Sequence, residues 1–140
     1  MMMKVEVIKE RLQHMKKTLK ELNSMKMIPK NELLNDTQIR WSIERGLQLV
    51  CETVFDIGSH ILVGSFDLSP PNYQDVINML REKGVISEDL GKKFKGLGGF
   101  RNILVHDYLE INSEEIYNKL QNRLGDFDQF VKEVVTYITS

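Results

Sequence analysis

The longest apolar pattern of the chain constrains its fold most. Between residues 39 and 61, apolar residues recur at steps of three and four, at Ile39, Ile43, Leu47, Val50, Val54, Ile57 and Ile61. This spacing predicts one face of a long α-helix, which Asn35 or Asp36 caps. Further apolar residues widen that face, namely Trp41, Leu49, Cys51, Phe55 and Leu62. A helix that is apolar on more than one side lies at the centre of its bundle, or packs against a second copy of the chain, and both can hold.

The rest of the chain repeats the helical period and has no alternating pattern typical of strands. An apolar stripe over residues 5–22 predicts a first amphipathic helix. Ser69 or Asn72 begins a short helix that Gly84 closes, Ser87 caps the next, and Asn112 caps the last. We therefore expect one all-α domain over residues 1–140, with four long helices and one short one in an up-and-down bundle.

Composition narrows the classes of function. The net charge of −1 excludes a nucleic-acid signature spread over the whole surface, so any RNA contact needs a local basic patch. The single cysteine, Cys51, lies in an apolar pattern and is interpreted as a small buried side chain. Charged residues in the first turns exclude a signal peptide, and no run reaches the roughly 20 apolar residues of a membrane span. We expect a cytoplasmic protein with no membrane contact.

A polar row follows the long helix at every fourth position, at Glu44, Gln48, Glu52, Asp56 and His60. The last three resemble a carboxylate–histidine metal set, because neighbours four apart share a helix face. The row nevertheless drifts by about 40° per step, which is more typical of a polar stripe along the edge of the core. We interpret Glu52, Asp56 and His60 as candidates to line a cleft, and expect neither a metal nor another cofactor.

Residues 96–108 gather the chemically versatile side chains of the chain. Arg101, Asn102, His106 and Tyr108 alternate there with an apolar anchor, residues 103–105. A histidine can exchange protons near neutral pH, and an arginine offers a permanent charge and a fork that fits phosphate oxygens. These are the tools for cleaving a phosphodiester without a metal. Positions five apart diverge by about 140° on a straight helix, so the pair requires a bent helix, a second subunit, or both.

Three glycines, Gly96, Gly98 and Gly99, precede this run. They could form a phosphate-binding loop, but no strand precedes them and no Lys-Ser pair follows, so close approach of two backbones is the better interpretation. Just upstream, Lys92, Lys93 and Lys95 are the best candidates for a local RNA-binding patch, although a solvated lysine face has the same pattern.

The segment from Arg101 to His106 resembles the R-x4-6-H motif of the HEPN superfamily, and Tyr108 extends it to R-x4-H-x-Y. That longer pattern is similar to the HepT toxins of HEPN–MNT toxin–antitoxin systems, the DUF86 family. The stretches 56–60 and 84–87 fit the same resemblance, which covers nearly the whole chain in helix order and length.

The resemblance implies an all-α homodimer with a metal-independent ribonuclease site at the dimer cleft. It implies catalytic roles for Arg101 and His106, with Asn102 assisting, on a tRNA or mRNA substrate. Tyr108 would be the hydroxyl that a partner MNT nucleotidyltransferase, the antitoxin of a type VII-like system, modifies with AMP; without the resemblance, a half-buried aromatic is the simpler interpretation. The alternative function is a non-catalytic helical module that binds a nucleotide or a nucleotidyltransferase partner.

Overall fold

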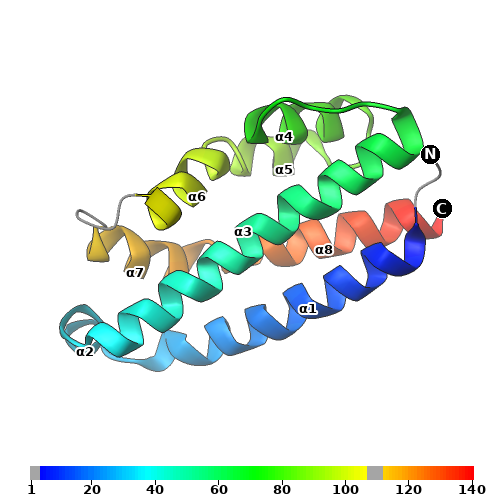
Figure 1. The fold of residues 1–140 in the computed structure, drawn as a ribbon. Coiled ribbons are helices and arrows are strands. Elements are labelled where there is room, and N and C mark those ends of the chain that lie inside the picture. Colours follow the sequence, from blue (N-terminus) through cyan, green and yellow to red (C-terminus); the bar gives the residue numbers. More distant parts are fainter. Residues whose placement is uncertain (1–3, 107–111) are drawn as a thin grey trace.

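The computed structural model describes residues 4–106 and 112–140, and these residues form helices joined by short links (Figure 1). The order is α1 (Val5–Ser24), the 3₁₀ turn η1 (Met25–Met27), α2 (Lys30–Asn35), α3 (Thr37–Phe66), α4 (Tyr73–Glu82), α5 (Glu88–Lys93), α6 (Leu97–His106), α7 (Ser113–Asn122) and α8 (Leu124–Thr139). No strand occurs within these described ranges, so the predicted all-α class is confirmed.

Helix α3 is the central element of the bundle. It contacts α1, α2, α4, α6 and α7, while α8 packs along α1 and also contacts α5 and α7. Figure 1 shows α3 crossing the molecule, with α4, α5 and α6 above it and α1 below. The two ends of the described chain lie at the same end of the bundle. This arrangement places α6, which carries the motif, directly against the middle of the longest helix.

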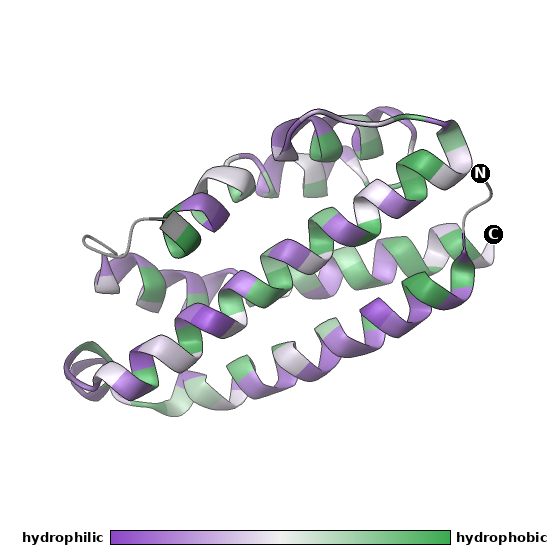
Figure 2. Ribbon diagram, viewed as in Figure 1, coloured by the Kyte–Doolittle hydropathy of each residue, from purple (hydrophilic) through white to green (hydrophobic). Residues whose placement is uncertain are grey.

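The predicted apolar stripes form the core. Ile43, Leu47, Val50, Val54, Ile57 and Ile61 of α3 are all buried, and so are Ile8, Leu12, Met15, Leu19 and Leu22 of α1. Figure 2 shows how apolar and polar residues recur in turn along each helix. Cys51, Phe55 and Leu62 are buried as well, whereas Trp41 and Leu49 remain exposed, at 64% and 36%. Central packing therefore explains most of the wide apolar face of α3, but not these two residues.

Side chains cap the helices where the sequence predicts them. Asp36 accepts hydrogen bonds from the backbone N–H groups of Gln38 and Ile39 at the start of α3. Asn72 begins α4, Ser87 begins α5 and Asn112 begins α7 in the same way. These bonds satisfy backbone donors that would otherwise have no partner in the helix, and they set where each helix begins.

Two helices that we expected to be continuous are divided. Gly96 separates α5 from α6, because its φ of +85° is a left-handed conformation that ends a helix. Arg123, with φ −119° and ψ −1°, separates α7 from α8. Both breaks let short helices change direction and still bury Leu97, Leu120 and Leu124. The bundle therefore contains more and shorter helices than the sequence predicts.

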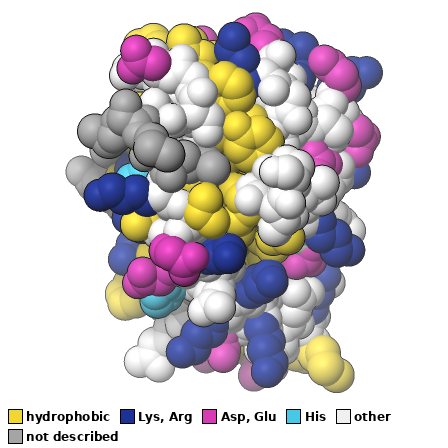
Figure 3. Space-filling view, turned by 90° about the vertical axis from the view of Figure 1, so that its right-hand side faces the viewer, with side chains coloured by type: hydrophobic (Ala, Val, Ile, Leu, Met, Phe, Trp, Pro, Cys, Tyr) yellow, Lys and Arg dark blue, Asp and Glu magenta, His cyan; other side chains and the backbone are white. Residues whose placement is uncertain are grey.

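The surface is mixed in character at the end of the bundle where the described termini meet. Figure 3 shows an apolar strip down the middle of this face, with basic and acidic side chains on both sides.

By length and composition alone, α3 could cross a membrane, a property that central helices of bundles share. In this fold α3 is instead surrounded by five other helices.

Candidate functional site

Helix α6 positions the motif by burying its apolar face. Leu97, Phe100 and Leu104 recur at steps of three and four, and each is less than 10% exposed. These side chains hold α6 against α3 and α4. Arg101 follows Phe100 at the edge of the buried face, and its side chain is only 18% exposed. The guanidinium is therefore held on a packed element rather than on a free loop.

Gly98 permits the close packing of α6 on α4. A Cβ atom added at Gly98 would lie 2.8 Å from the Cβ of Tyr73, a contact too short for real side chains. The predicted role in close approach is thus confirmed for Gly98. It does not extend to Gly99, where an added Cβ would meet nothing within 4 Å among the described residues.

Arg101 is fixed by contacts from three directions. Its Nη2 donates to Oε1 of Glu52 at 3.1 Å, and its Nη1 donates to Oδ1 of Asn102 at 3.4 Å. The centre of the guanidinium lies 5.0 Å from the centroid of the Tyr73 ring, a cation–π distance. The buried Nε has no hydrogen-bond partner among the described residues. Arg101 is therefore oriented, yet its capacity to donate hydrogen bonds is not exhausted.

An aromatic pair supports the arginine and opens into a cleft. The rings of Tyr73 and Phe55 lie 4.3 Å apart between centroids, so Tyr73 is held between α3 and the guanidinium. The cleft beside them is lined by Phe55, Ser59, Pro70, Pro71, Asn72, Tyr73, Val76 and Asn102. Apolar rings with a few amide and hydroxyl groups can accommodate a planar base next to a phosphate bound at Arg101.

The polar row of α3 divides between two neighbours. Glu52 faces α6 and contacts Arg101, while Gln48 donates to the same Oε1 of Glu52 at 3.1 Å. Asp56 instead pairs with Arg11 of α1 and lies 3.5 Å from Nε2 of His60. Of the three predicted cleft residues, the structure thus brings only Glu52 to the motif. Within the described residues, no three His, Cys, Asp or Glu side chains gather closely enough to hold a metal ion.

Cys51 takes no part in this chemistry. Burial, reinforced by the adjacent Glu52, raises the pKa of its thiol to about 12, although Lys119 and Arg101 oppose the shift. A thiol with so high a pKa stays protonated and is a poor nucleophile. The interpretation of Cys51 as a small buried side chain is confirmed.

The other motif residues lie at the end of α6 or beyond it. His106 is the last residue of the helix, one turn after Asn102, so these two positions share a helix face. Positions 101 and 106 are about 140° apart around the same helix. Tyr108, the predicted modification site, lies outside the described residues.

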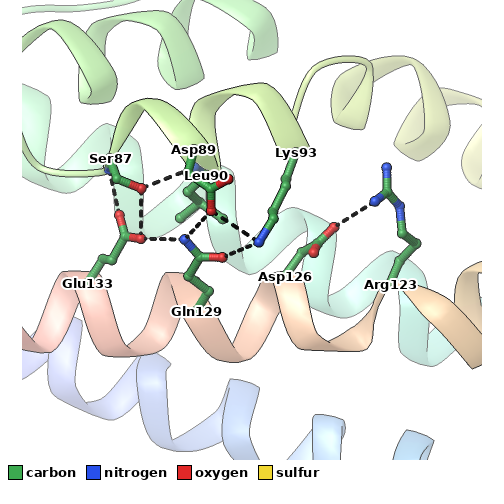
Figure 4. A network of polar contacts seen from close by, with 8 residues as sticks. All are labelled: Ser87, Asp89, Leu90, Lys93, Arg123, Asp126, Gln129 and Glu133. Carbon is green, nitrogen blue, oxygen red and sulfur yellow. Dashed lines mark hydrogen bonds and ion pairs between the residues drawn. The ribbon is translucent and has the colours of Figure 1, made fainter.

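The three predicted RNA-binding lysines are in different environments. Lys93 pairs with Asp89 at 3.1 Å and donates to Gln129 at 2.9 Å, which joins α5 to α8 (Figure 4). A hydrogen bond that Gln129 donates to Asp89, together with the contact from Lys93, lowers the pKa of the Asp89 carboxyl. Lys92 and Lys95 are exposed and form no ion pair with another described residue. Of the three lysines, Lys93 is thus already engaged in contacts that join α5 to α8.

Sequence patterns missed Tyr73 as a site residue. Its only local signal is the preceding cap residue, Asn72, because the contact to Arg101 joins two different helices. Together, Arg101, its carboxylate and its aromatic support form a preorganised cation beside a cleft, which suits a phosphate ester.

Comparison with known proteins gives consistent matches. A family model described as Ribonuclease HepT-like matches residues 6–134. The mRNA nuclease HepT of Shewanella oneidensis is 32% identical over 101 residues, covering 72% of this chain and 76% of the relative. The tRNA nuclease HepT of Aphanizomenon flos-aquae is 25% identical over 133 residues, covering 94% and 90%. Among solved structures, the tri-AMPylated Shewanella oneidensis HEPN toxin in complex with its MNT antitoxin matches with a TM-score of 0.84 at 27% identity, covering 93% of this chain and 97% of that one.

Proposed function

This chain belongs to the HepT-like ribonuclease family, and we propose that it is a metal-independent endoribonuclease toxin held in check by a nucleotidyltransferase antitoxin. The observation that carries the proposal is the fixed guanidinium of Arg101, bonded to Glu52 and stacked on Tyr73 at the edge of a cleft. The substrate is RNA of the tRNA or mRNA class, since relatives are named as nucleases of both kinds. The cytoplasm is the expected site of action, since that is where both RNA classes are found.

The chemistry follows from the two motif residues. Arg101 donates to non-bridging oxygens of the scissile phosphate, where negative charge grows in the transition state. His106 exchanges a proton with the ribose 2′-hydroxyl or the leaving oxygen. Asn102 is placed to assist both residues. Its side-chain oxygen accepts a hydrogen bond from Arg101, and its position shares a helix face with His106. Neither role needs a metal.

A second copy of the chain completes the site in this proposal. Helix α6 is continuous from Leu97 to His106, and on a regular helix positions 101 and 106 are about 140° apart. Trp41, Leu49 and Glu52 fall within about 100° of one another around α3. The first two are exposed apolar residues, and the third holds Arg101. A copy seated on this stripe buries Trp41 and brings its own motif next to Arg101, so we propose a homodimer with a composite site.

The antitoxin acts through Tyr108 in this proposal. The matching Shewanella oneidensis toxin is described as tri-AMPylated and in complex with an MNT antitoxin. Tyr108 is the tyrosine of the R-x4-H-x-Y pattern, two positions after His106. Each AMP adds bulk and negative charge beside the place of the RNA phosphate, which blocks substrate binding.

The direct test is cleavage by the purified chain. Wild type, Arg101→Ala and His106→Ala are incubated with total RNA and with separate tRNA and mRNA transcripts, in the presence of excess EDTA. We expect wild type to cleave and both variants to lose activity by roughly 100-fold or more. If the folded wild type leaves the RNA intact, the ribonuclease proposal fails, and the alternative function is a non-catalytic module that binds a nucleotide or a nucleotidyltransferase. Cleavage that EDTA abolishes would contradict the metal-independent mechanism.

A further inference from the structure

The cleft beside Arg101 has no charged side chain among the described residues that line it. Its volume is about 470 Å³, within the range of ligand sites in proteins. Tyr73 and Asn102 line the cleft, and both also contact the guanidinium of Arg101. A phosphate bound at Arg101 therefore places its nucleoside next to a neutral space, which suits a base better than a second phosphate.

The apolar wall of the cleft is accessible to a ligand. Pro71 is exposed, and Pro70 and Tyr73 are half-buried, so part of each ring is uncovered. Two consecutive prolines also restrict the backbone of the link between α3 and α4. This wall can therefore pack against the flat face of a base.

Two amide side chains of the cleft are oriented by groups that can only donate. Oδ1 of Asn72 accepts from the backbone N–H of Asp75 at 2.9 Å, as the cap of α4. Oδ1 of Asn102 accepts from Nη1 of Arg101 at 3.4 Å. Because a backbone N–H and a guanidinium have no acceptor, the oxygen of each amide must face its partner. The amides are thus left with their NH₂ groups to offer to a ligand, and neither group has an acceptor among the described residues.

Donors of this kind distinguish bases by the groups on the edge of the ring. Guanine presents the carbonyl oxygen O6 next to the acceptor N7, and hypoxanthine, the base of inosine, has the same edge. Adenine has an amino group in place of O6, so a donor of the protein would face a donor of the base. Two facing donors form no hydrogen bond, and a donor that loses its water without a new partner costs free energy.

We propose that this cleft binds the base next to the phosphate held by Arg101, and that Asn72 and Asn102 select a base with a carbonyl oxygen over adenine. The inference rests on the proposed ribonuclease function and adds a base preference at the cleavage site. Asn72 is the residue to change, because its only hydrogen bond to a described residue is the cap to Asp75. Asn102 also contacts Arg101, so its replacement would change the guanidinium as well.

Binding of methylated oligonucleotides to the full chain tests the preference without cleavage. Each is a short single strand of adenosines, methylated at every 2′-oxygen, whose central base is adenine, hypoxanthine or guanine. Asn72→Ser keeps an oxygen that caps α4, and Asn72→Asp keeps the cap but replaces the NH₂ group by a second acceptor. Asn78→Ser is the control, since Asn78 is in α4 but does not line the cleft. Calorimetric titration gives the affinities, and thermal melts establish that each variant is folded.

We expect wild type to bind the inosine and guanosine strands roughly tenfold more tightly than the adenosine strand. Asn72→Ser should lower this ratio to about threefold or less, and Asn72→Asp should remove or reverse it, while Asn78→Ser should keep it. No measurable binding to folded wild type, equal affinities for the three strands, or a ratio that Asn72→Asp leaves unchanged would each overturn the proposal.

Cleavage of the same strands without methylation separates this inference from the proposed ribonuclease function. We expect wild type to cut mainly beside the inosine or guanosine. Cuts at every linkage, together with equal affinities, would overturn the base preference and leave the ribonuclease. Selective binding without any cut would overturn the ribonuclease and leave the base preference.

Discussion

Nη2 of Arg101 lies 3.1 Å from Oε1 of Glu52, a contact between residues 49 positions apart in the chain. It joins the motif helix to the middle of α3. The ring of Tyr73, in α4, contacts the same guanidinium. A carboxylate here does not bind RNA, since it repels phosphate. Its role in this account is to orient the guanidinium.

Removing that carboxylate should therefore lower cleavage without removing Arg101. We predict that Glu52→Ala reduces kcat/KM by roughly 10- to 100-fold, because the guanidinium loses its orientation. Glu52→Gln keeps an oxygen that accepts from Arg101 and should recover much of the activity. Asp56→Asn, one turn further along α3 but paired with Arg11, should reduce cleavage far less. Equal losses in all three variants would argue for a general effect on α3.

The glycines of α6 provide a matched pair for stability. Gly98→Ala introduces a Cβ 2.8 Å from that of Tyr73 and should lower the free energy of unfolding by about 1–3 kcal/mol. Gly99→Ala places a Cβ in open space on the same helix and should raise it by about 0.5–1 kcal/mol. Urea denaturation followed by circular dichroism measures both. Destabilisation by Gly99→Ala of the same size as by Gly98→Ala would contradict the packing of α6 on α4.

The exposed tryptophan of α3 tests the proposed homodimer. Trp41→Ala should weaken self-association by at least about tenfold, because a buried aromatic at the centre of an interface contributes strongly. Met27→Ala removes another exposed apolar side chain, 89% exposed and in η1 rather than α3, and should have no effect. Light scattering coupled to size-exclusion chromatography, over a range of concentrations, gives the masses. A wild type that is monomeric at every concentration would rule out the composite site.

Mass spectrometry tests the proposed off-switch. Co-expression with the cognate nucleotidyltransferase should add AMP units to the intact chain, and Tyr108→Phe should abolish the addition. Tyr137→Phe, in α8, is the control and should be modified like wild type. Retention of the added mass in Tyr108→Phe would assign the modification to another residue.

Local signals predicted most of the fold. The stripes of α1 and α3 and the caps Asp36, Asn72, Ser87 and Asn112 each depend on residues within a turn or two of one another, and the structure has them where expected. The divisions at Gly96 and Arg123 were missed, because helical periodicity continues across both positions. Only the backbone conformation, left-handed at Gly96, distinguishes a break from a helix that contains a glycine.

The site was predictable in its residues and not in its contacts. Arg101 and His106 stand out by type and spacing, and Glu52 by its place in the polar row. The row itself could not reveal that Glu52 turns to α6 while Asp56 turns to Arg11, since both continue the same four-residue step. Tyr73 is an ordinary helical residue in the sequence, and only the packing of α4 on α6 gives it a place near the motif.

The central claim is that Arg101 and His106 make this chain a ribonuclease toxin. Inducible expression of wild type, Arg101→Ala and His106→Ala, without the antitoxin, measures it directly through growth and the integrity of cellular RNA. We predict that wild type arrests growth and fragments tRNA or mRNA, while both variants, expressed at equal levels, do neither. Normal growth with intact RNA in cells that accumulate the folded wild type would contradict the account.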